Sequence, residues 1–250
     1  MLVTKLPNGQ PEIFLSIQGE GKTVGMSCIF IRFSICNLHC KYCDSYFTWN
    51  FKENPGENHH YREKVFKNDY QLEMSYKEVV KKILALPSKR VVFTGGEPMI
   101  YQEDLINIMK CLRRKDKSYK FEIETNGTIE CSKEFIKLID QINCSPKLIS
   151  SGNPAMIANR PKAINSIKKS PKTIFKFVLC GKSLLRDFNS VQDWQEQYDV
   201  DNEQIFLMPE GISKKVVITG SKNIFHNFCK FGYNLSTRLH VILFNNKRAV

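Results

Sequence analysis

Three cysteines lie close together in the first fifth of the chain, at Cys36, Cys40 and Cys43. In a [4Fe–4S] cluster each iron normally takes one protein thiolate. A C-x3-C-x2-C trio therefore supplies three ligands and leaves one iron open, so that a small molecule can bind that iron directly. The spacing predicts a cluster with a reactive iron.

Two other interpretations of the trio stay open when it is considered alone. The cysteines also suit a zinc site of the Cys3His type, for which the chain offers His39, His59 and His60. Structural zinc sites usually combine two short-spaced pairs of ligands, and the sequence has no second pair. Three ordinary buried thiols are the remaining possibility, but such clustering by chance is improbable with nine cysteines in 250 residues.

Short apolar strands alternate with amphipathic helices along the chain. Residues 75–78 have the form of a helical capping box, and residues 105–112 place their apolar side chains on one helical face. Strand–helix alternation predicts parallel strands with right-handed crossovers. We therefore expect an α/β fold, a partial TIM-like barrel of six parallel strands that is open on one side. The expected strands are residues 28–33, 90–94, 120–124, 142–144, 173–179 and 204–208.

Polar or Gly/Pro turns follow five of these strands. In barrels of parallel strands the chemistry gathers at the carboxyl ends of the strands. The turns should therefore meet at one rim of the barrel and carry the functional site. They are the cysteine loop and residues 95–98, 125–127, 145–147 and 209–211.

The length suits a single domain over residues 1–250, since α/β folds of this size are often undivided. Within it we expect a cluster loop at 34–49 and a closing segment at 235–250. A polar stretch at 50–73 predicts an excursion or lid rather than a linker. The apolar run at 241–244 predicts a closing strand.

Two features beside the cysteines suggest ligand contacts. Gly95 and Gly96 permit close approach of the backbone to a ligand, and Pro98 suits a first helical turn. Glu122 and Glu124 share one face of an expected strand. Two carboxylates on a buried face are costly unless that face lines a polar cavity; a solvent-facing edge strand is the alternative.

Composition indicates a soluble globular protein, with 42% hydrophobic and 25% charged residues. The sequence shows neither a run of about 18 apolar residues nor a secretory signal, so we expect no membrane span. Unpaired cysteines and an oxygen-labile cluster favour the cytoplasm. The net charge of +12 suits a nucleic-acid partner, but the lysines are dispersed, so a solvated surface is the preferred explanation and a nucleic-acid partner is not expected. An acidic electron-transfer protein would also be attracted.

The cysteine trio followed by Gly95-Gly96-Glu97-Pro98 resembles the radical S-adenosylmethionine (SAM) superfamily, in which SAM chelates the fourth iron. Three further segments are similar to the 7-carboxy-7-deazaguanine synthase family. They are the opening at 12–21 (EIFLSIQGEG), the stretch at 44–49 (DSYFTW) and the ending with Arg238 to His240 and Asn246 to Val250. The resemblance spans nearly the whole chain. One departure is Ala249, where glycine is expected.

This resemblance implies a lyase of queuosine and 7-deazapurine biosynthesis. An electron from a flavodoxin-like donor would reduce the cluster, and SAM would be cleaved to a 5′-deoxyadenosyl radical. That radical would remove hydrogen from C6 of 6-carboxy-5,6,7,8-tetrahydropterin. Ring contraction would then expel ammonia and give 7-carboxy-7-deazaguanine, with SAM regenerated. The family also implies Mg²⁺ as a cofactor and a homodimer.

The resemblance also implies roles for individual residues. Ser45 matches the Mg²⁺ ligand, a hard oxygen donor. The pterin would meet Ile17, Gln18, Gly19, Arg32, Thr94 and the terminal carboxylate of Val250. For Arg32 the role is a charge-assisted contact with the substrate carboxylate, with a surface salt bridge as its alternative. SAM would be bound by Tyr42, Asp44, Gly96, Glu97, Glu124, Thr125, Asn126, Ser145, Pro146, Lys147, Met208 and Pro209.

Two rival functions follow from the same features. A glycyl-radical-enzyme activase also carries C-x3-C-x2-C in a short chain, although it has no need of the QGEG opening at 18–21 or of the terminal signature. A basic zinc-bearing nucleic-acid-binding module is the rival that is not an enzyme. No side chain is expected to act as a catalytic acid or base, because the cluster and SAM supply the radical.

Overall fold

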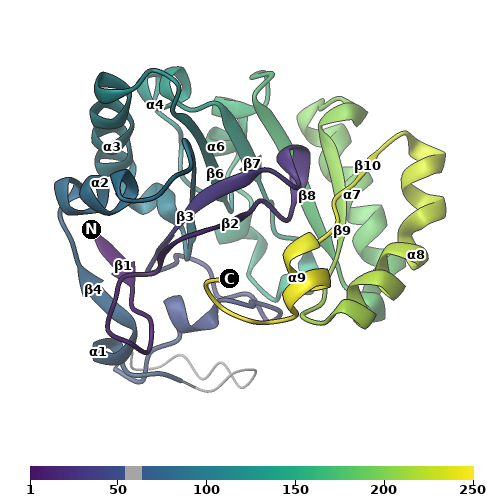
Figure 1. The fold of residues 1–250 in the computed structure, drawn as a ribbon. Helices are drawn as coiled ribbons and strands as arrows, with labels where there is room; N and C mark the ends of the chain where they lie inside the picture. Colours follow the sequence, from purple (N-terminus) through teal and green to yellow (C-terminus); the bar gives the residue numbers. More distant parts are fainter. Residues whose placement is uncertain (54–63) are drawn as a thin grey trace.

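The protein, analysed as a computed structural model, is described over residues 1–53 and 64–250. Its strands fall into a long parallel series and a short antiparallel group near the N-terminus (Figure 1). The strands are β1 (Leu2–Thr4), β2 (Ile13–Ile17), β3 (Ser27–Phe33), β4 (Gln71–Glu73), β5 (Arg90–Gly95), β6 (Lys120–Thr125), β7 (Gln141–Cys144), β8 (Thr173–Leu179), β9 (Ile205–Pro209) and β10 (Asn234–Leu235).

Helices connect the parallel strands. They are α1 (Lys67–Tyr70), α2 (Tyr76–Leu84), α3 (Gln102–Lys115), α4 (Lys133–Leu138), α5 (Ala155–Ala158), α6 (Pro161–Ile167), α7 (Leu184–Tyr198), α8 (Lys214–Phe231) and α9 (Leu239–Phe244). In the described part of the chain no helix is both long enough and apolar enough to cross a bilayer.

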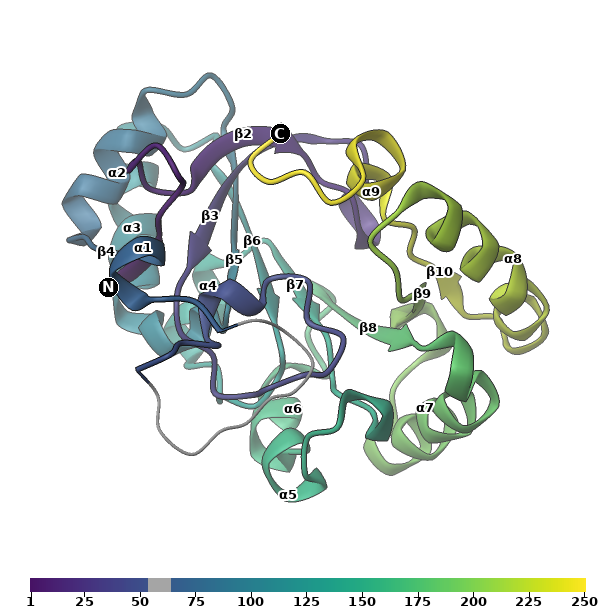
Figure 2. The same cartoon turned by 90° about the horizontal axis from the view of Figure 1, so that it is seen from below.

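The strands form one sheet in the order β10-β9-β8-β7-β6-β5-β3-β1-β4, with β2 paired to β3 beside this path. Neighbours from β3 to β10 run parallel, whereas β1, β2 and β4 pair antiparallel. The sheet curves into an arc with α2, α3, α6, α7 and α8 on its outer side (Figure 2). The six expected strands are all present as parallel neighbours, so the predicted open, partial barrel is confirmed.

The two faces of the sheet differ because side chains alternate along each strand. On β6, Phe121 and Ile123 belong to the apolar core, where the Phe121 ring stacks on Phe93 at 6.0 Å. Glu122 and Glu124 point to the opposite, inner face and contact polar side chains there. β6 lies between β5 and β7, so the alternative of a solvent-facing edge strand is wrong.

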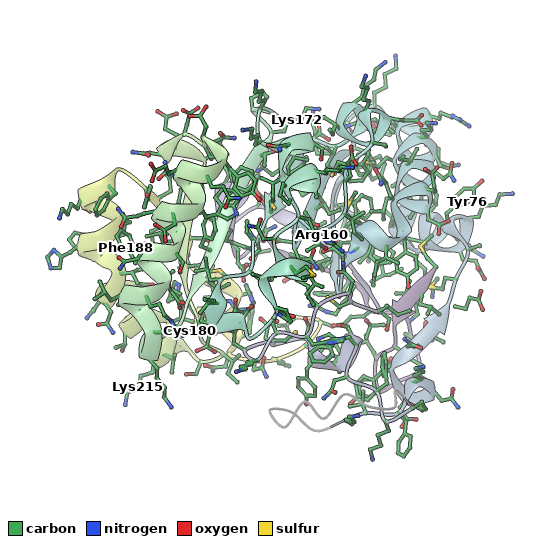
Figure 3. All side chains as sticks on the ribbon, turned by 180° about the vertical axis from the view of Figure 1, so that it is seen from behind. Tyr76, Arg160, Lys172, Cys180, Phe188 and Lys215 are labelled. Carbon is green, nitrogen blue, oxygen red and sulfur yellow. The ribbon has the colours of Figure 1, made fainter. Side chains whose placement is uncertain are left out.

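The basic side chains are prominent on the outer surface. Lys215 near the start of α8 is exposed and projects away from the fold (Figure 3). Arg114 at the end of α3 is likewise exposed. Such positions are typical of a solvated charged surface.

The expected closing strand at 241–244 is wrong. The chain pairs briefly with β9 as β10 and then forms the helix α9, which ends at Phe244. A short apolar run does not distinguish a strand from a helix. Here only Val241 of the run is buried, while Leu243 and Phe244 are more than one-third exposed, because α9 packs one side against α8.

The polar stretch at 50–73 is described only at its ends, and residues 54–63 lie outside the described part. Phe51 bridges to Val65, so the two described ends meet. α1 and β4 follow, and β4 extends the sheet beyond β1. The last residues of the predicted excursion are therefore an edge strand of the sheet.

The capping box of α2 forms as expected. The Ser75 hydroxyl accepts the Glu78 backbone N–H at 3.3 Å, and the Glu78 carboxylate accepts the Ser75 N–H at 2.8 Å. We expect Ser75→Ala to lower the free energy of unfolding by about 1 kcal/mol, because the Glu78 N–H loses its side-chain partner. Urea unfolding measures this change. Lys77→Ala, on the exposed part of the same helix, is the control, and equal effects of both changes would contradict the capping role.

Candidate active site

The cysteine loop begins where β3 ends, and its two ends are tied together. The Ile35 N–H and the Ser34 hydroxyl both donate to the Thr48 carbonyl, at 2.7 and 3.0 Å. Ile35 has a φ of 73°, a conformation that is uncommon for a β-branched residue. The backbone therefore turns sharply before Cys36 and returns to the barrel rim at Thr48.

The three predicted ligand cysteines line one cavity of about 300 Å³ at this rim. All three are free thiols. Asn153 donates its side-chain N–H to the Cys40 sulfur at 3.1 Å, and Trp49 donates its indole N–H to the Cys43 sulfur at 3.3 Å. Such donors stabilise thiolates and tune iron–sulfur clusters. The donor set and its polar surroundings thus fit a cluster held by three cysteines.

The predicted zinc site receives no support from the histidines. His39 donates its backbone N–H to Asn153 at 2.8 Å, and its ring packs on Trp49 at 4.6 Å between centroids. His59 and His60 lie outside the described residues. Within the described residues, no three His, Cys, Asp or Glu side chains converge on the position of a single metal ion. A cluster does not need this convergence, because each cysteine binds a different iron.

The Gly95-Gly96 turn packs directly against the start of the cysteine loop. A Cβ on Gly96 would lie 2.0 Å from the Ile35 carbonyl oxygen, and Gly95 has a φ of 127°. No other residue type fits this contact without displacing the backbone. The turn therefore brings the ends of β3 and β5 together beside the cysteines.

Glu97 is buried and joins two turns of the rim. Its carboxylate accepts the Met99 and Asn126 backbone N–H groups, at 2.9 and 2.7 Å, and the Thr125 hydroxyl at 2.8 Å. Burial raises the pKa of Glu97 above its usual value, although these donors oppose the shift. Its side chain fixes the turn after β6 and is absent from the cavity lining.

Most of the other predicted site residues meet in the same cavity. Apart from Gly19, Glu97, Pro146 and Pro209, every residue expected to touch the cluster, SAM, Mg²⁺ or the pterin lines it. These are Ile17, Gln18, Arg32, Tyr42, Asp44, Ser45, Thr94, Gly96, Glu124, Thr125, Asn126, Ser145, Lys147, Met208 and Val250, together with the cysteines. Gly19 lies beside the cavity and accepts the Leu239 N–H at 2.8 Å.

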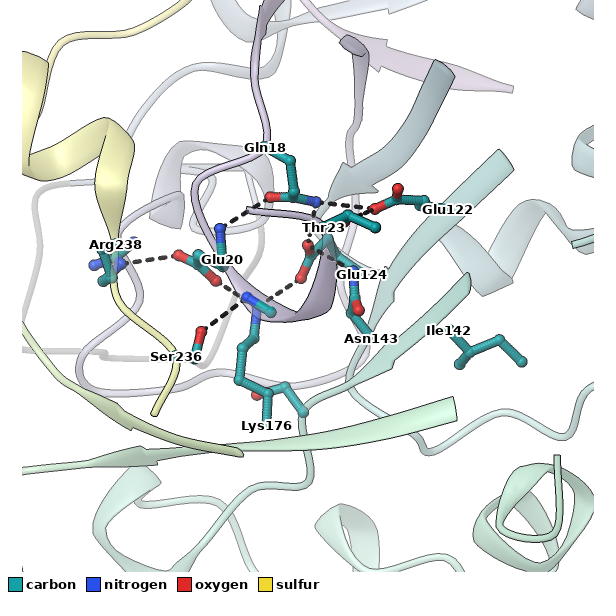
Figure 4. Close-up of polar contacts among 12 residues, drawn as sticks. Gln18, Glu20, Thr23, Glu122, Glu124, Ile142, Asn143, Lys176, Ser236 and Arg238 are labelled. Carbon is teal, nitrogen blue, oxygen red and sulfur yellow. Dashed lines mark hydrogen bonds and ion pairs between the residues drawn. The ribbon is translucent and has the colours of Figure 1, made fainter. Parts of the chain in front are cut away.

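Sequence reasoning missed a set of buried charges on the floor of the cavity (Figure 4). The Lys176 ammonium is 3% exposed and pairs with Glu20 and with Glu124, the latter at 2.7 Å. Arg238 pairs with Glu20 at 2.9 Å and with Asp44. The sequence did contain one signal of these buried charges, the single lysine in the apolar strand at 173–179. A lysine in such a strand needs polar partners if it is buried.

The charges shift one another's pKa values. Burial alone would raise the pKa of Glu20, but Lys176 and Arg238 outweigh it and hold that pKa well below its usual range. Burial raises the pKa of Glu124 despite the nearby Lys176. Burial also lowers the pKa of His240, which faces Glu20 across 3.9 Å. The imidazole is therefore mainly neutral near pH 7.

A second group of charges lies at the other end of the cavity. Arg32 donates its Nε–H to the buried Glu12 at 3.0 Å, and Arg248 donates to the second oxygen of Glu12 at 2.6 Å. The Ser16 hydroxyl donates to a terminal oxygen of Val250. Arg32 and the chain terminus thus border one space, as their predicted roles require, and the Arg32 ion pair is partly buried rather than on the open surface.

A cysteine loop at the carboxyl edge of an open parallel barrel is the architecture of a radical SAM protein, and the model of the Radical SAM superfamily matches residues 30–152. A 7-carboxy-7-deazaguanine synthase of Pyrobaculum aerophilum is 31% identical over 95% of both chains. One of Clostridium acetobutylicum is 30% identical over 96% of this chain and 97% of its own. The chain belongs to the 7-carboxy-7-deazaguanine synthase family.

A solved structure supports the fold independently. QueE from Escherichia coli matches with a TM-score of 0.66, at 22% identity, over 96% of this chain and 95% of its own. At this identity the likeness speaks for the fold. Because the match covers 96% of this chain, it extends well beyond residues 30–152, which the superfamily model matches.

The Glu20 carboxylate predicts a pH dependence of stability. Because its pKa is depressed in the folded protein, the unfolded chain binds more protons as pH falls, and the free energy of unfolding declines below about pH 5. We expect Arg238→Met to lower that free energy by about 3 kcal/mol at pH 7 and to flatten the acid decline. Urea unfolding at several pH values measures both effects.

Arg114→Met removes an exposed arginine and is the matched control for Arg238→Met. It should leave both the stability and the pH profile close to those of the original chain. Parallel acid profiles for Arg238→Met and the original chain would contradict the coupling of Arg238 to Glu20.

Proposed function

We propose that this chain is a radical SAM lyase that converts 6-carboxy-5,6,7,8-tetrahydropterin into 7-carboxy-7-deazaguanine and ammonia. The observation that carries the proposal is sequence identity of about one-third to named synthases over nearly the full length of both chains. The cavity supports it, because the cysteines and all the predicted pterin residues except Gly19 border the same space. The product belongs to queuosine and 7-deazapurine biosynthesis.

On the cofactor side, Cys36, Cys40 and Cys43 would hold a [4Fe–4S] cluster, and SAM would lie against the rim turns. When bound, these groups supply a carbon-centred radical. The chain's own part is placement. Gly96 lines the cavity, and Asn126 lies beside the cysteine loop through its bond to Asn37 at 2.9 Å. Thr125, Ser145, Lys147 and Met208 line the same cavity and would surround the ligand.

Tyr42 and Asp44 flank Cys43 and would border SAM from the loop. Asp44 is held by Arg238, so its carboxylate has a fixed direction. Lys147 donates to the Ser145 hydroxyl at 2.9 Å, which orders the turn after β7. Such preorganised polar groups orient a ligand without rearrangement during the reaction.

On the substrate side, Arg32 would meet the pterin carboxylate. Its Nε is taken by Glu12, while its two terminal nitrogens bond to no other described residue. Thr94 is the register partner of Arg32 on the neighbouring strand and shares its face. The backbone at Ile17, Gln18 and Gly19 and the carboxylate of Val250 would hold the pterin edge.

The finer assignments are also proposals. One domain over 1–250 carries the site, two copies form a homodimer, and an acidic, flavodoxin-like protein in the cytoplasm donates electrons. The net charge of +12 favours association with an acidic donor. Substrate enters from solvent, with no part for a membrane or a nucleic acid.

The decisive experiment incubates anaerobically reconstituted protein with SAM, Mg²⁺, a chemical reductant and the carboxytetrahydropterin. We expect 7-carboxy-7-deazaguanine and ammonia in equal amounts, with SAM conserved. Cys40→Ser should abolish the product and reduce the bound iron, since one thiolate ligand is lost. SAM cleavage without the deazaguanine would favour the activase, and one zinc without iron would favour the nucleic-acid module.

Ser45 is the proposed Mg²⁺ ligand. Its hydroxyl is largely buried, lies 3.7 Å from the Cys43 sulfur and donates to the Gly95 carbonyl at 3.4 Å. We expect Ser45→Ala to weaken the stimulation by Mg²⁺ at least about tenfold, since a hard oxygen donor is removed. Iron and sulfide content should stay unchanged. An unaltered Mg²⁺ response would refute the role.

A further inference from the structure

Glu12 is a fully buried carboxylate to which the family resemblance gives no role. It lies directly before β2, and its backbone is fixed from two sides. Its N–H donates to the Thr4 carbonyl at 2.7 Å, and its own carbonyl accepts the Arg32 N–H at 3.1 Å. The side chain therefore starts from a rigid position between β1 and β3.

Each oxygen of this carboxylate takes one guanidinium. Arg32 occupies the first at 3.0 Å and Arg248 the second at 2.6 Å. Both arginines line the cavity, whereas Glu12 lies behind them. Charge-assisted contacts of this kind are short and directional. The trio has a net charge of +1, so positive charge remains for an anionic ligand.

Arg248 belongs to the C-terminal tail, which crosses the open side of the barrel towards β2 (Figure 2). Its guanidinium lies 3.8 Å from the centroid of the Phe47 ring and donates to the Lys5 carbonyl at 3.4 Å. Two residues further on, Val250 accepts the Ser16 hydroxyl. The tail is thus attached at Arg248 and at Val250, and of these two attachments the one at Arg248 includes an ion pair, to Glu12.

Loss of the Glu12 charge would leave two guanidinium groups facing each other without a counter-ion. Both guanidinium groups lie within hydrogen-bond distance of the Glu12 carboxylate, so without its charge they repel each other. Solvent and salt screen this repulsion only weakly in a partly buried site. The tail is the part that can move away, because residues 243–247 before Arg248 are exposed. Arg32 would lose the contact that orients its Nε, and the wall formed by Arg248, Ala249 and Val250 would open.

We propose that Glu12 is a positioning residue that couples Arg32 to the C-terminal tail, so that the anion-binding arginine and the terminal carboxylate are presented together. The attachment of the tail follows from the contacts alone. The effect on substrate binding rests on the proposed function, in which the substrate is a heterocycle with a carboxylate and with N–H donors. Glu12 acts through both arginines and needs no contact with the substrate.

The test uses the cluster-loaded protein and the variants Glu12→Gln, Glu12→Asp and Arg248→Met. Hydrogen exchange of the tail amides is measured without substrate, and KM and kcat are measured with the carboxytetrahydropterin. We expect Glu12→Gln and Arg248→Met to raise tail exchange and KM at least about tenfold, with a smaller change in kcat. Glu12→Asp, which keeps the charge, should restore part of both.

Glu73→Gln is the matched control, because it removes an exposed carboxylate from β4 in the same part of the sheet. It should change neither tail exchange nor KM. Tail exchange in the double variant Glu12→Gln with Arg248→Met should be no faster than in the more severe single variant, since both changes remove the same ion pair between Glu12 and Arg248.

Tail exchange unchanged in both Glu12→Gln and Arg248→Met would overturn the proposal. Additive effects of the two changes on tail exchange in the double variant would overturn it too. If Glu12→Gln does not fold, Arg248→Met alone decides, because it leaves Glu12 paired with Arg32. If the unaltered protein makes no deazaguanine, the proposed function fails, while tail exchange still decides whether Glu12 holds the tail.

Discussion

The buried ammonium of Lys176 is the interaction on which the inner half of the barrel depends. It lies between Glu20, from the loop after β2, and Glu124 on β6. Arg238 extends the pairing from Glu20 to Asp44 in the cysteine loop. Breaking a buried ion pair by removing one partner typically costs 3–5 kcal/mol. Segments far apart in the sequence are therefore held together by charge where an open barrel offers no closing strand.

This network explains how a parallel sheet carries a polar face. Parallel strands are usually apolar on both sides because helices cover both. Here α2, α3, α6, α7 and α8 lie on the outer side (Figure 2), whereas α9 borders the cavity with His240 and Val241. The inner carboxylates are satisfied in place: Glu124 accepts from Gln18 at 3.1 Å and from Asn143 at 3.2 Å besides its cation. Fixed dipoles and charges then surround the ligand space before any ligand binds. The polar groups of the protein therefore need not reorient during the reaction, which avoids a cost in free energy.

The sequence predicted the parallel strands well, because each is a short apolar run followed by a polar turn, and each of the five turns predicted at the rim contributes to the cavity lining. It did not reveal Lys176, since one lysine in a strand has no periodic signature and its partners at 20 and 124 come from distant segments. The closing strand failed for a related reason: the side that Val241 presents to the fold is set by packing on α8, a tertiary contact. Glu97 shows that a motif residue can serve its site by fixing a neighbouring turn at Asn126 rather than by facing the cavity.

The chain's end shows how strain and anchoring combine. Asn245 and Ala249 both have a φ of 54°, and a residue with a Cβ that is held at a positive φ costs on the order of 1–3 kcal/mol. Glycine, which the family resemblance predicts at 249, would relieve this strain. It would also increase the conformational entropy that the tail loses when it becomes ordered. With alanine, the turn before Val250 persists only while the residues on either side are held, by Glu12 at Arg248 and by Ser16 at Val250. The departure at 249 therefore makes this tail depend more strongly on its two attachments than a glycine-bearing tail would.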